Sequence, residues 1–179
     1  MAGTLTFRPV TMANVGDFET LFGAPGAPKY CWCMTWRATG DELTDTSSAS
    51  RHRQMAGRIG NKQQVGLLAY RDRMPVGWVS VAPRTSFRGL GGPEDDAPVW
   101  SLTCLFVARA QRKTGLSAAL IQAAADHARE QGGAVLEAYP VDPDSPSYRF
   151  MGFVPAFERL GFDAVGRVGK RRHVMRLGL

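Results

Sequence analysis

The best-defined element in the sequence is an amphipathic helix that directly follows an apolar strand. Mostly apolar residues recur at positions 116, 119, 120, 123, 124, 127 and 128, on one face of a helix that ends at Gly132-Gly133. The preceding run Val99–Val107 is rich in β-branched and aromatic residues, as buried strands are. A strand that leads through a turn into such a helix restricts the chain to folds in which helices cover a sheet.

Further strands and helices are predicted on both sides of this unit. Period-two alternation or β-rich composition predicts strands at 5–10, 65–70, 76–81, 134–141, 162–168 and 172–177. Helical spacing predicts helices at 14–22, with Asn14 as the N-cap, from Ser48 or Ser50 to about 59, and at 153–160. Segments 29–46 and 83–98 have no clear period, so they are predicted as loops or short turns. The order predicts one α/β domain over residues 1–179, with a mixed sheet flanked by about four helices.

Composition excludes several classes of protein. The chain has 179 residues, the length of one domain, and 22 Lys plus Arg against 16 Asp plus Glu give a net charge of +6, which favours an anionic partner. No apolar stretch is long enough to span a membrane and no leader pattern opens the chain, so we expect a cytoplasmic protein. Three cysteines and three scattered histidines form no ligand motif, so no metal is expected.

The turn between the central strand and the long helix carries the clearest functional signal. Arg109, Arg112 and Lys113 stand there together with Gly115. A basic, glycine-bearing turn at a helix N-terminus presents backbone N–H groups and the positive end of the helix dipole, which together bind anions. The alternative is an ordinary loop with solvated cations. The spacing matches neither a dinucleotide-binding GxGxxG nor a P-loop.

Here the sequence resembles a known family. Arg112-Lys-Thr-Gly115-Leu-Ser117 is similar to the R/Q-x-x-G-x-G/A pyrophosphate loop of the GNAT superfamily of acyl-CoA-dependent N-acetyltransferases, with Ser117 in place of Gly or Ala. The element order matches over nearly the whole chain, and Phe157-Glu-Arg-Leu-Gly161-Phe162 resembles the Gly-Phe end of the family's fourth helix. Tyr30-Cys-Trp-Cys-Met-Thr-Trp36 with Leu136-Glu-Ala-Tyr-Pro-Val141 resembles an uncharacterised bacterial branch. The resemblance implies a mostly antiparallel sheet whose fourth and fifth strands splay apart.

The resemblance also implies a site for acetyl-CoA. The pantetheine would lie along the backbone of Leu105, Phe106 and Val107. The pyrophosphate would bind the N–H groups of Arg112, Lys113, Thr114, Gly115, Leu116 and Ser117. An N–H near Leu105 would polarise the thioester and stabilise the tetrahedral oxyanion. The acceptor would be an amine of a small molecule or peptide. Dimers are common in the family, so a homodimer is one alternative, but the sequence leaves the oligomeric state open.

An amine attacks only when neutral, so a base or a water chain is required. Glu137 lies inside an apolar strand that the resemblance sets beside the thioester, and it is the favoured base; the alternative is that it pairs with an arginine such as Arg176. Asp142 is a weaker candidate because its surroundings predict a turn. The family's usual acid, a tyrosine, is replaced by Phe157 beside the coenzyme. Either Tyr148 protonates the thiolate or the thiolate leaves unaided.

Other conspicuous residues have structural and functional interpretations. Cys31, Cys33 and Cys104 are favoured as small buried hydrophobes over acetyl-cysteine intermediates. Tyr30, Trp32 and Trp36 either line an acceptor pocket or cover the sheet. His127 is predicted in the core, and Lys170–His173 as solvated charge in a turn.

The sequence thus predicts an N-acetyltransferase that uses acetyl-CoA, without a metal. The alternative is a non-catalytic acyl-CoA-binding module, which the loss of the usual tyrosine at Phe157 keeps open. A nucleic-acid-binding domain is disfavoured because the aromatic residues are not interleaved with the cations.

Overall fold

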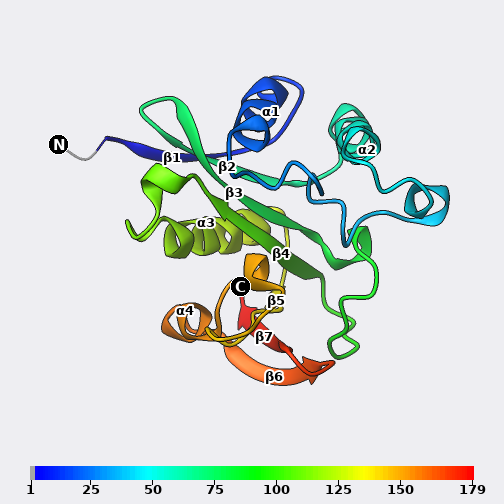
Figure 1. Cartoon of the computed structure of the whole chain (residues 1–179). Helices are drawn as coiled ribbons and strands as arrows, with labels where there is room; N and C mark the ends of the chain where they lie inside the picture. Colours follow the sequence, from blue (N-terminus) through cyan, green and yellow to red (C-terminus); the bar gives the residue numbers. More distant parts are fainter. Residues whose placement is uncertain (1–2) are drawn as a thin grey trace.

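The computed structural model describes residues 3–179 as one sheet flanked by helices (Figure 1). Seven strands run in the order β1-β2-β3-β4-β5-β7-β6. They are β1 Leu5–Pro9, β2 Gly66–Arg71, β3 Met74–Pro83, β4 Val99–Val107, β5 Val135–Ala138, β6 Asp163–Val168 and β7 Arg172–Gly178. The helices are α1 Val15–Gly23, α2 Ser48–Gly60, α3 Leu116–Glu130 and α4 Val154–Arg159, with short 3-10 turns η1 Gly40–Leu43, η2 Arg84–Ser86, η3 Arg109–Gln111 and η4 Arg149–Met151. The predicted fold class and element order are confirmed.

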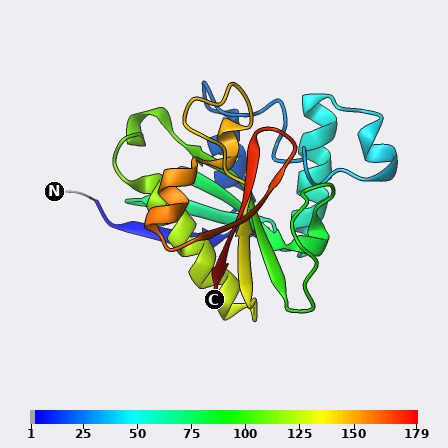
Figure 2. The same ribbon diagram turned by 90° about the horizontal axis from the view of Figure 1, so that it is seen from below.

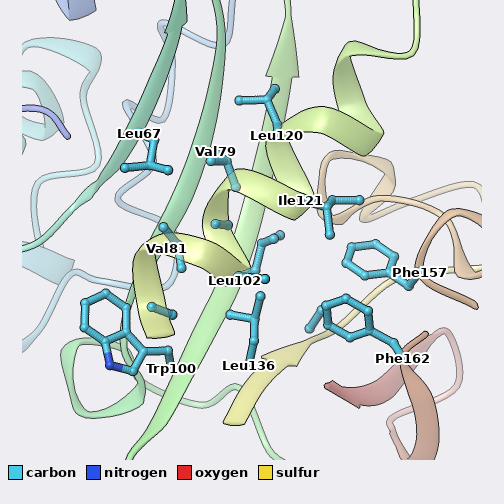
Figure 3. Close-up of a cluster of buried hydrophobic side chains, with 14 of the residues drawn as sticks. Leu67, Val79, Val81, Trp100, Leu102, Leu120, Ile121, Leu136, Phe157 and Phe162 are labelled. Atoms are coloured by element: carbon cyan, nitrogen blue, oxygen red, sulfur yellow. The ribbon is translucent and has the colours of Figure 1, made fainter. Parts of the chain in front are cut away.

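Two apolar layers cover the two faces of the sheet. Because side chains alternate along a strand, Leu67 and Ala69 of β2 belong to one cluster while Leu68 and Tyr70 belong to the other. Figure 3 shows the first cluster, in which Leu120 and Ile121 of α3 lie among the sheet residues and Phe157 and Phe162. The second cluster packs α1, α2 and the 29–38 segment on the opposite face. The view in Figure 2 shows α3 and α2 on either side of the sheet.

The pairing of β4 changes along its length. It pairs in parallel with β5 only from Val99↔Val135 to Leu102↔Ala138, and every other pairing in the sheet is antiparallel. On its other side β4 stays paired with β3 up to Gly77↔Val107. Residues 103–107 of β4 therefore have β3 as a neighbour but no longer β5. This is the separation of the fourth and fifth strands that the family resemblance implied.

The predicted helix caps and strand ends were less accurate than the predicted order of the elements. Asn14 stands at the N-cap of α1 but does not cap it, because its side chain instead accepts from the Thr11 N–H at 2.8 Å and donates to the Pro9 carbonyl. The cap of α2 is Ser47, whose hydroxyl accepts from the Ser50 N–H at 3.2 Å. The strand predicted at 134–141 ends at Ala138, and Pro140 soon after it has no N–H to donate to a sheet.

His127 lies in the core, as predicted. It is buried on α3 with its ring edge-on to Trp100 at 5.7 Å, and its Nε2 lies 3.2 Å from Gln64 Oε1. Burial lowers the pKa of His127 below its ordinary value because it disfavours the charged ring.

The burial of His127 predicts that the free energy of unfolding depends on pH. The neutral ring contributes stability above the unfolded pKa of about 6.5, and this is lost as pH falls through the lower folded pKa, because the unfolded chain binds the proton first. Between about pH 7 and pH 5 we expect the free energy of unfolding, measured by urea denaturation, to fall less in His127→Gln than in the wild type. Equal losses in the two proteins would contradict this role of His127.

Candidate functional site

The turn between β4 and α3 is exposed and held in an open shape. After η3, residues 112–115 are exposed, while Leu116 is buried and anchors the start of α3. Lys113 and Gly115 both have left-handed backbone angles, with φ of +63° and +82°. A Cβ at Gly115 would meet no heavy atom within 4 Å, so the outer side of the turn is open. The conformation therefore favours glycine, and the space beside it is free for a ligand.

The first backbone N–H groups of α3 have no partner within the helix. The first helical hydrogen bond runs from the Ala119 N–H to the Gly115 carbonyl at 3.1 Å, so the N–H groups before residue 119 precede the ladder. No side chain caps this helix end. Arg112 and Lys113 add two charges next to these donors. The turn has the chemistry of an anion site.

The end of β4 offers backbone donors on its open edge. The register between β3 and β4 slips at Ser80/Val81 and leaves Thr103 without a partner, which is a β-bulge. Beyond it, the Ala108 N–H donates to the Val76 carbonyl on the β3 side at 2.9 Å. Because backbone donors alternate, the N–H groups of Leu105 and Val107 point to the opposite side, where β5 has diverged.

A cavity of about 400 Å³ lies against this open edge. Apolar and small side chains from β4, α3 and α4 form most of its wall, with two arginines at its border. The lining residues are Leu105, Phe106, Val107, Arg112, Ser117, Ile121, Arg149, Gly152, Phe153 and Ala156. The Arg149 guanidinium is held by the carbonyls of Pro143 at 2.8 Å and Ser145 at 3.1 Å. The structure thus brings the predicted strand residues together with Arg112 and Ser117 around one cavity, whereas residues 113–116 of the predicted turn do not line it.

Phe157 supports this cavity from below. Its ring is fully buried and packs edge-on against Phe162 at 5.1 Å (Figure 3). A Cβ at Gly152, where φ is +88°, would come within 2.7 Å of the Phe157 ring and 3.2 Å of Leu105. Glycine at 152 therefore allows the backbone to lie directly on the ring. Phe157 is part of the floor, beneath the lining residues Leu105 and Gly152.

A second, smaller cavity of about 50 Å³ opens on the other face of β4. It is lined by Pro28, Tyr30, Cys31, Cys33, Thr35, Trp36, Thr103, Cys104 and Phe150. Thr103 and Cys104 directly precede Leu105, so both cavities meet the same stretch of β4. Tyr30 and Trp36 line this cavity, whereas Trp32 covers the core, stacked on Phe22 at 5.4 Å. Tyr30 and Trp36 therefore match the interpretation as pocket residues, whereas Trp32 matches the interpretation as a residue that covers the sheet.

The cysteines are buried and free. The Trp78 indole N–H points to the Cys33 sulfur at 3.0 Å. Burial raises the pKa of Cys33 well above its usual value, and contact with the Cys33 thiol together with burial raises that of Cys31. Protonated thiols are poor nucleophiles, so these two residues match the interpretation as small buried side chains.

Tyr148 lines neither cavity itself but directly precedes residues that do. Its neighbour Arg149 lines the larger one and Phe150 lines the smaller one. The Tyr148 ring lies 6.2 Å from Trp36 and 6.4 Å from Phe150, and the residue is 37% exposed. Tyr148-Arg-Phe-Met-Gly152-Phe153 repeats the spacing of Phe157 to Gly161-Phe162, with a tyrosine in first place. That repeat is the signal from which Gly152 and Phe153, absent from the predicted site, could have been found.

Glu137 has a different environment from the one predicted for a base. Its carboxylate is fully buried and accepts from Arg176 Nε at 2.7 Å, Arg84 Nη1 at 3.3 Å and the Tyr139 hydroxyl at 2.6 Å. Burial and the Glu137 charge raise the pKa of Tyr139, so its phenol stays protonated and donates. Arg176 also pairs with Asp95 at 2.7 Å. The carboxylate thus joins the sheet to the 83–98 loop.

Glu137 also lies far from the open edge of β4. It pairs with Ser101, four residues before Leu105, which corresponds to roughly 13 Å along a strand. The structure does not bring Glu137 together with the other predicted site residues. Its geometry favours the alternative that the sequence left open, pairing with Arg176.

The residues of the basic turn at 170–173 have two different environments. Lys170 and Arg171 are exposed, as predicted for solvated charge. Arg172 is buried, which corrects the prediction for that residue, and its guanidinium lies over the Trp36 ring at 4.5 Å. His173 pairs with Asp142 at 3.0 Å, so that carboxylate is engaged as well.

Comparison with known proteins identifies the family. The model of the acetyltransferase (GNAT) family matches residues 32–162, which include both cavities except for Pro28, Tyr30 and Cys31. The chain belongs to the GNAT family of acetyltransferases. In GNAT enzymes the acetyl donor is acetyl-CoA. Among residues 3–179 of this GNAT protein, no group of three or more His, Cys, Asp or Glu is placed to hold a metal ion, and no helix is long and apolar enough to cross a membrane.

Solved structures share the GNAT fold over almost the whole chain. The aminoglycoside acetyltransferase AAC(6′)-Ib in complex with coenzyme A is 15% identical, with a TM-score of 0.64 over 98% of this chain and 95% of its own. A ribosomal-protein-alanine N-acetyltransferase from Brucella melitensis is 20% identical, with a TM-score of 0.56 over 97% and 99%. PaiA N-acetyltransferase from Thermoplasma acidophilum in complex with coenzyme A is 11% identical, with a TM-score of 0.56 over 98% and 99%. At these identities the likeness shows the fold alone, and comparison with curated proteins gave no match.

The position of Glu137 predicts a structural role that can be separated from catalysis. Glu137→Gln leaves Arg84 and Arg176 without their buried counter-charge, and we expect a loss of roughly 2–4 kcal/mol in the free energy of unfolding. This lies toward the lower end for a broken buried pair because the two arginine side chains are 23% and 15% exposed. Urea denaturation measures the loss.

The matched control for that variant is Glu94→Gln, the same chemical change at an exposed position of the 83–98 loop, which should leave the unfolding midpoint unchanged. Turnover of folded Glu137→Gln should stay within a few-fold of the wild type. A fall of about 10²-fold or more with unchanged stability would restore the role of base.

Proposed function

We propose that this chain transfers the acetyl group of acetyl-CoA to a primary amine by direct attack. The observation that carries the proposal is the coincidence of three features at one cavity: the open N-terminus of α3, the unpaired edge of β4 and two bordering arginines. Coenzyme A complexes of GNAT proteins with this fold support the choice of ligand.

In this proposal the coenzyme spans the cavity. Its pyrophosphate binds the N–H groups of residues 113–117, where the helix dipole and the charges of Arg112 and Lys113 act together; the Arg112 N–H itself donates to the Arg109 carbonyl at 3.3 Å. The pantetheine lies along Leu105–Val107 and takes the backbone hydrogen bonds that β5 does not. The coenzyme carries several negatively charged phosphates, which agrees with the net charge of +6 on the chain.

The chemistry follows from the open edge of β4. The amine nitrogen attacks the thioester carbon, and the Leu105 N–H stabilises the negative oxygen that develops. No Asp or Glu lines either cavity, so the amine loses its proton to solvent before attack rather than to a carboxylate of the site. The nitrogen then gives its extra proton to solvent, the C–S bond breaks, and we assign to Tyr148 the protonation of the departing thiolate.

A second candidate function is a non-catalytic acyl-CoA-binding module. Two observations favour it: Phe157 has no hydroxyl to protonate a thiolate, and neither cavity is lined by a carboxylate. Both candidates bind the coenzyme, but only an enzyme releases free thiol when an amine is added. A thiol-release assay with acetyl-CoA and a panel of amines therefore separates them.

Binding at the turn is testable by thermal stability. At 100 times its dissociation constant, acetyl-CoA should stabilise the wild type by about 2.7 kcal/mol and raise its Tm. Gly115→Glu should remove the shift, because a carboxylate there repels the pyrophosphate. The matched control is Gly132→Glu at the other end of α3, where φ is +85° and the space is equally open. It carries the same backbone strain and should keep the shift; loss of the shift in both variants would refute the assignment.

The acid step is testable at two positions. Tyr148→Phe should lower thiol release by about 10²-fold if the phenol protonates the thiolate, since placed proton donors contribute that much. Phe157→Tyr should raise the rate, most clearly at low pH, because the Phe157 ring edge faces Gly152 and Leu105 on the cavity wall. If Tyr148→Phe leaves the rate unchanged, the thiolate departs unaided. If Phe157→Tyr is no faster, either departure is not the limiting step or the packed ring has no room for the hydroxyl.

A further inference from the structure

Arg172 is a buried cation without a carboxylate partner. It is 7% exposed, and within residues 3–179 no Asp or Glu oxygen lies within 4 Å of its guanidinium. Its side chain makes one hydrogen bond in that part of the chain, from Nη1 to the Leu90 carbonyl at 3.0 Å. Burial lowers the pKa of Arg172, as expected for a charge removed from water without a counter-ion.

The arginines around Glu137 show how a buried cation is usually stabilised, which is by pairing with a carboxylate. Arg176 shares two carboxylates, Glu137 and Asp95, and Arg84 contacts the first of them. Burial of a charge is costly unless it is paired, so a guanidinium left without an anion needs another explanation. Aromatic rings compensate part of that cost at Arg172: its Cζ lies 4.5 Å from the Trp36 ring centre and 5.6 Å from that of Tyr148. The Trp36 and Tyr148 rings cannot accept hydrogen bonds from the remaining N–H groups of the guanidinium, which point along the guanidinium plane.

The ring beneath Arg172 has an unsatisfied donor of its own. The Trp36 Nε1 is buried and has no hydrogen-bond partner, while other atoms of Trp36 line the small cavity beside β4. Two neighbouring side chains therefore hold hydrogen-bond donors that no atom of residues 3–179 accepts. A guanidinium can bind a carboxylate with two parallel hydrogen bonds.

The topology sets Arg172 near the larger cavity. Val141 forms isolated bridges with Phe153 on one side and Arg172 on the other. Phe153 lines the larger cavity, so Arg172 lies two strand spacings away, roughly 10 Å. The Arg172 guanidinium lies over the ring of Trp36, which lines the small cavity, so it stands behind one wall of that cavity.

We propose that Arg172, whose guanidinium lies over the Trp36 ring, binds a carboxylate of the acceptor, so that the acceptor is an amine the size of an amino acid that carries a carboxylate. The inference rests on the proposed acetyl transfer and specifies its substrate class. It disfavours polycationic acceptors, because the small cavity has aromatic, thiol and hydroxyl walls and no acidic lining residue. On binding, the carboxylate exchanges its hydrogen bonds to water for hydrogen bonds to the protein. No covalent bond forms or breaks at Arg172.

The test compares matched acceptors. Common L-amino acids and their carboxamides are offered with saturating acetyl-CoA, and kcat/KM is taken from thiol release. The wild type should prefer the carboxylate of each reactive pair by roughly tenfold to a hundredfold, the range of one charge-assisted interaction. The amine of a carboxamide is the less basic of the two and more often neutral, so this preference would arise against the reactivity of the nucleophile.

Three variants assign the preference to Arg172. Arg172→Gln should reduce the ratio to near one while the carboxamide still reacts, and Arg172→Lys should retain part of it. The control Arg171→Gln removes one charge from the exposed neighbouring residue and should leave the ratio as in the wild type. Because each ratio is taken within one protein, lower stability of a variant does not affect it. A wild-type ratio of one, or a ratio that survives Arg172→Gln, overturns the proposal.

Failure of the proposed function is distinguishable from failure of this inference. If acetyl-CoA binds but no amine releases thiol, acetyl transfer is refuted, and the dissociation constants of the same acid and amide pairs, measured by calorimetry with coenzyme A present, still test Arg172. Tighter binding of the acid that is lost in Arg172→Gln supports the carboxylate site. Equal binding of acid and amide, or binding of neither, overturns it. If only carboxamides or polyamines react, the acetyltransferase stands and the carboxylate site is refuted.

Discussion

After Leu102, β4 loses β5 as a neighbour, and the candidate site follows from that separation. A strand inside a sheet has both edges hydrogen-bonded, but β4 beyond its bulge at Thr103 is bonded only to β3. The free N–H groups on the other edge need acceptors, and a ligand can supply them. Pro140 helps to end β5, and Val141 then bridges Phe153 and Arg172 instead of β4. The cavity fills the space that the missing strand would have occupied.

The buried charge of Glu137 stabilises the paired part of that arrangement. The last positions at which β4 and β5 pair include Ser101 and Glu137, and Tyr139 links the two through its hydroxyl, 2.8 Å from Ser101 and 2.6 Å from Glu137. Arg176 of β7 and Arg84 of η2 hold the same carboxylate from two other segments. A buried network of this kind is weak evidence for stability by itself, but it fixes where pairing ends. An acidic residue in an apolar strand thus has a structural reason.

The sequence predicted what depends on near neighbours and missed what depends on distant ones. The strand, turn and helix from residue 99 to 130 follow from local periodicity, and the family resemblance added the strand separation. The arginine partners of Glu137 come from segments about fifty and forty residues away; the sequence offered Arg176 only as an alternative, and no local pattern indicates Arg84. Trp32 and Trp36 have different surroundings partly because Trp32 and Cys33 adopt positive φ, which breaks any period. The buried state of Arg172 likewise depends on Trp36, more than a hundred residues earlier.

The separation of the strands also explains how two cavities on opposite faces can serve one reaction. Leu105 and Val107 pack toward α3, whereas Cys104 and Phe106 pack toward α1 and its neighbours. In a continuous sheet, hydrogen-bonded backbone would separate a thioester on one face from an amine on the other. Where β5 has diverged, only the edge of β4 stands between the cavities. In the reaction that we propose, the amine would reach the carbonyl carbon past this edge while the Leu105 N–H stabilises the developing oxyanion. One missing strand neighbour would then provide the binding edge, the oxyanion donor and the route of attack.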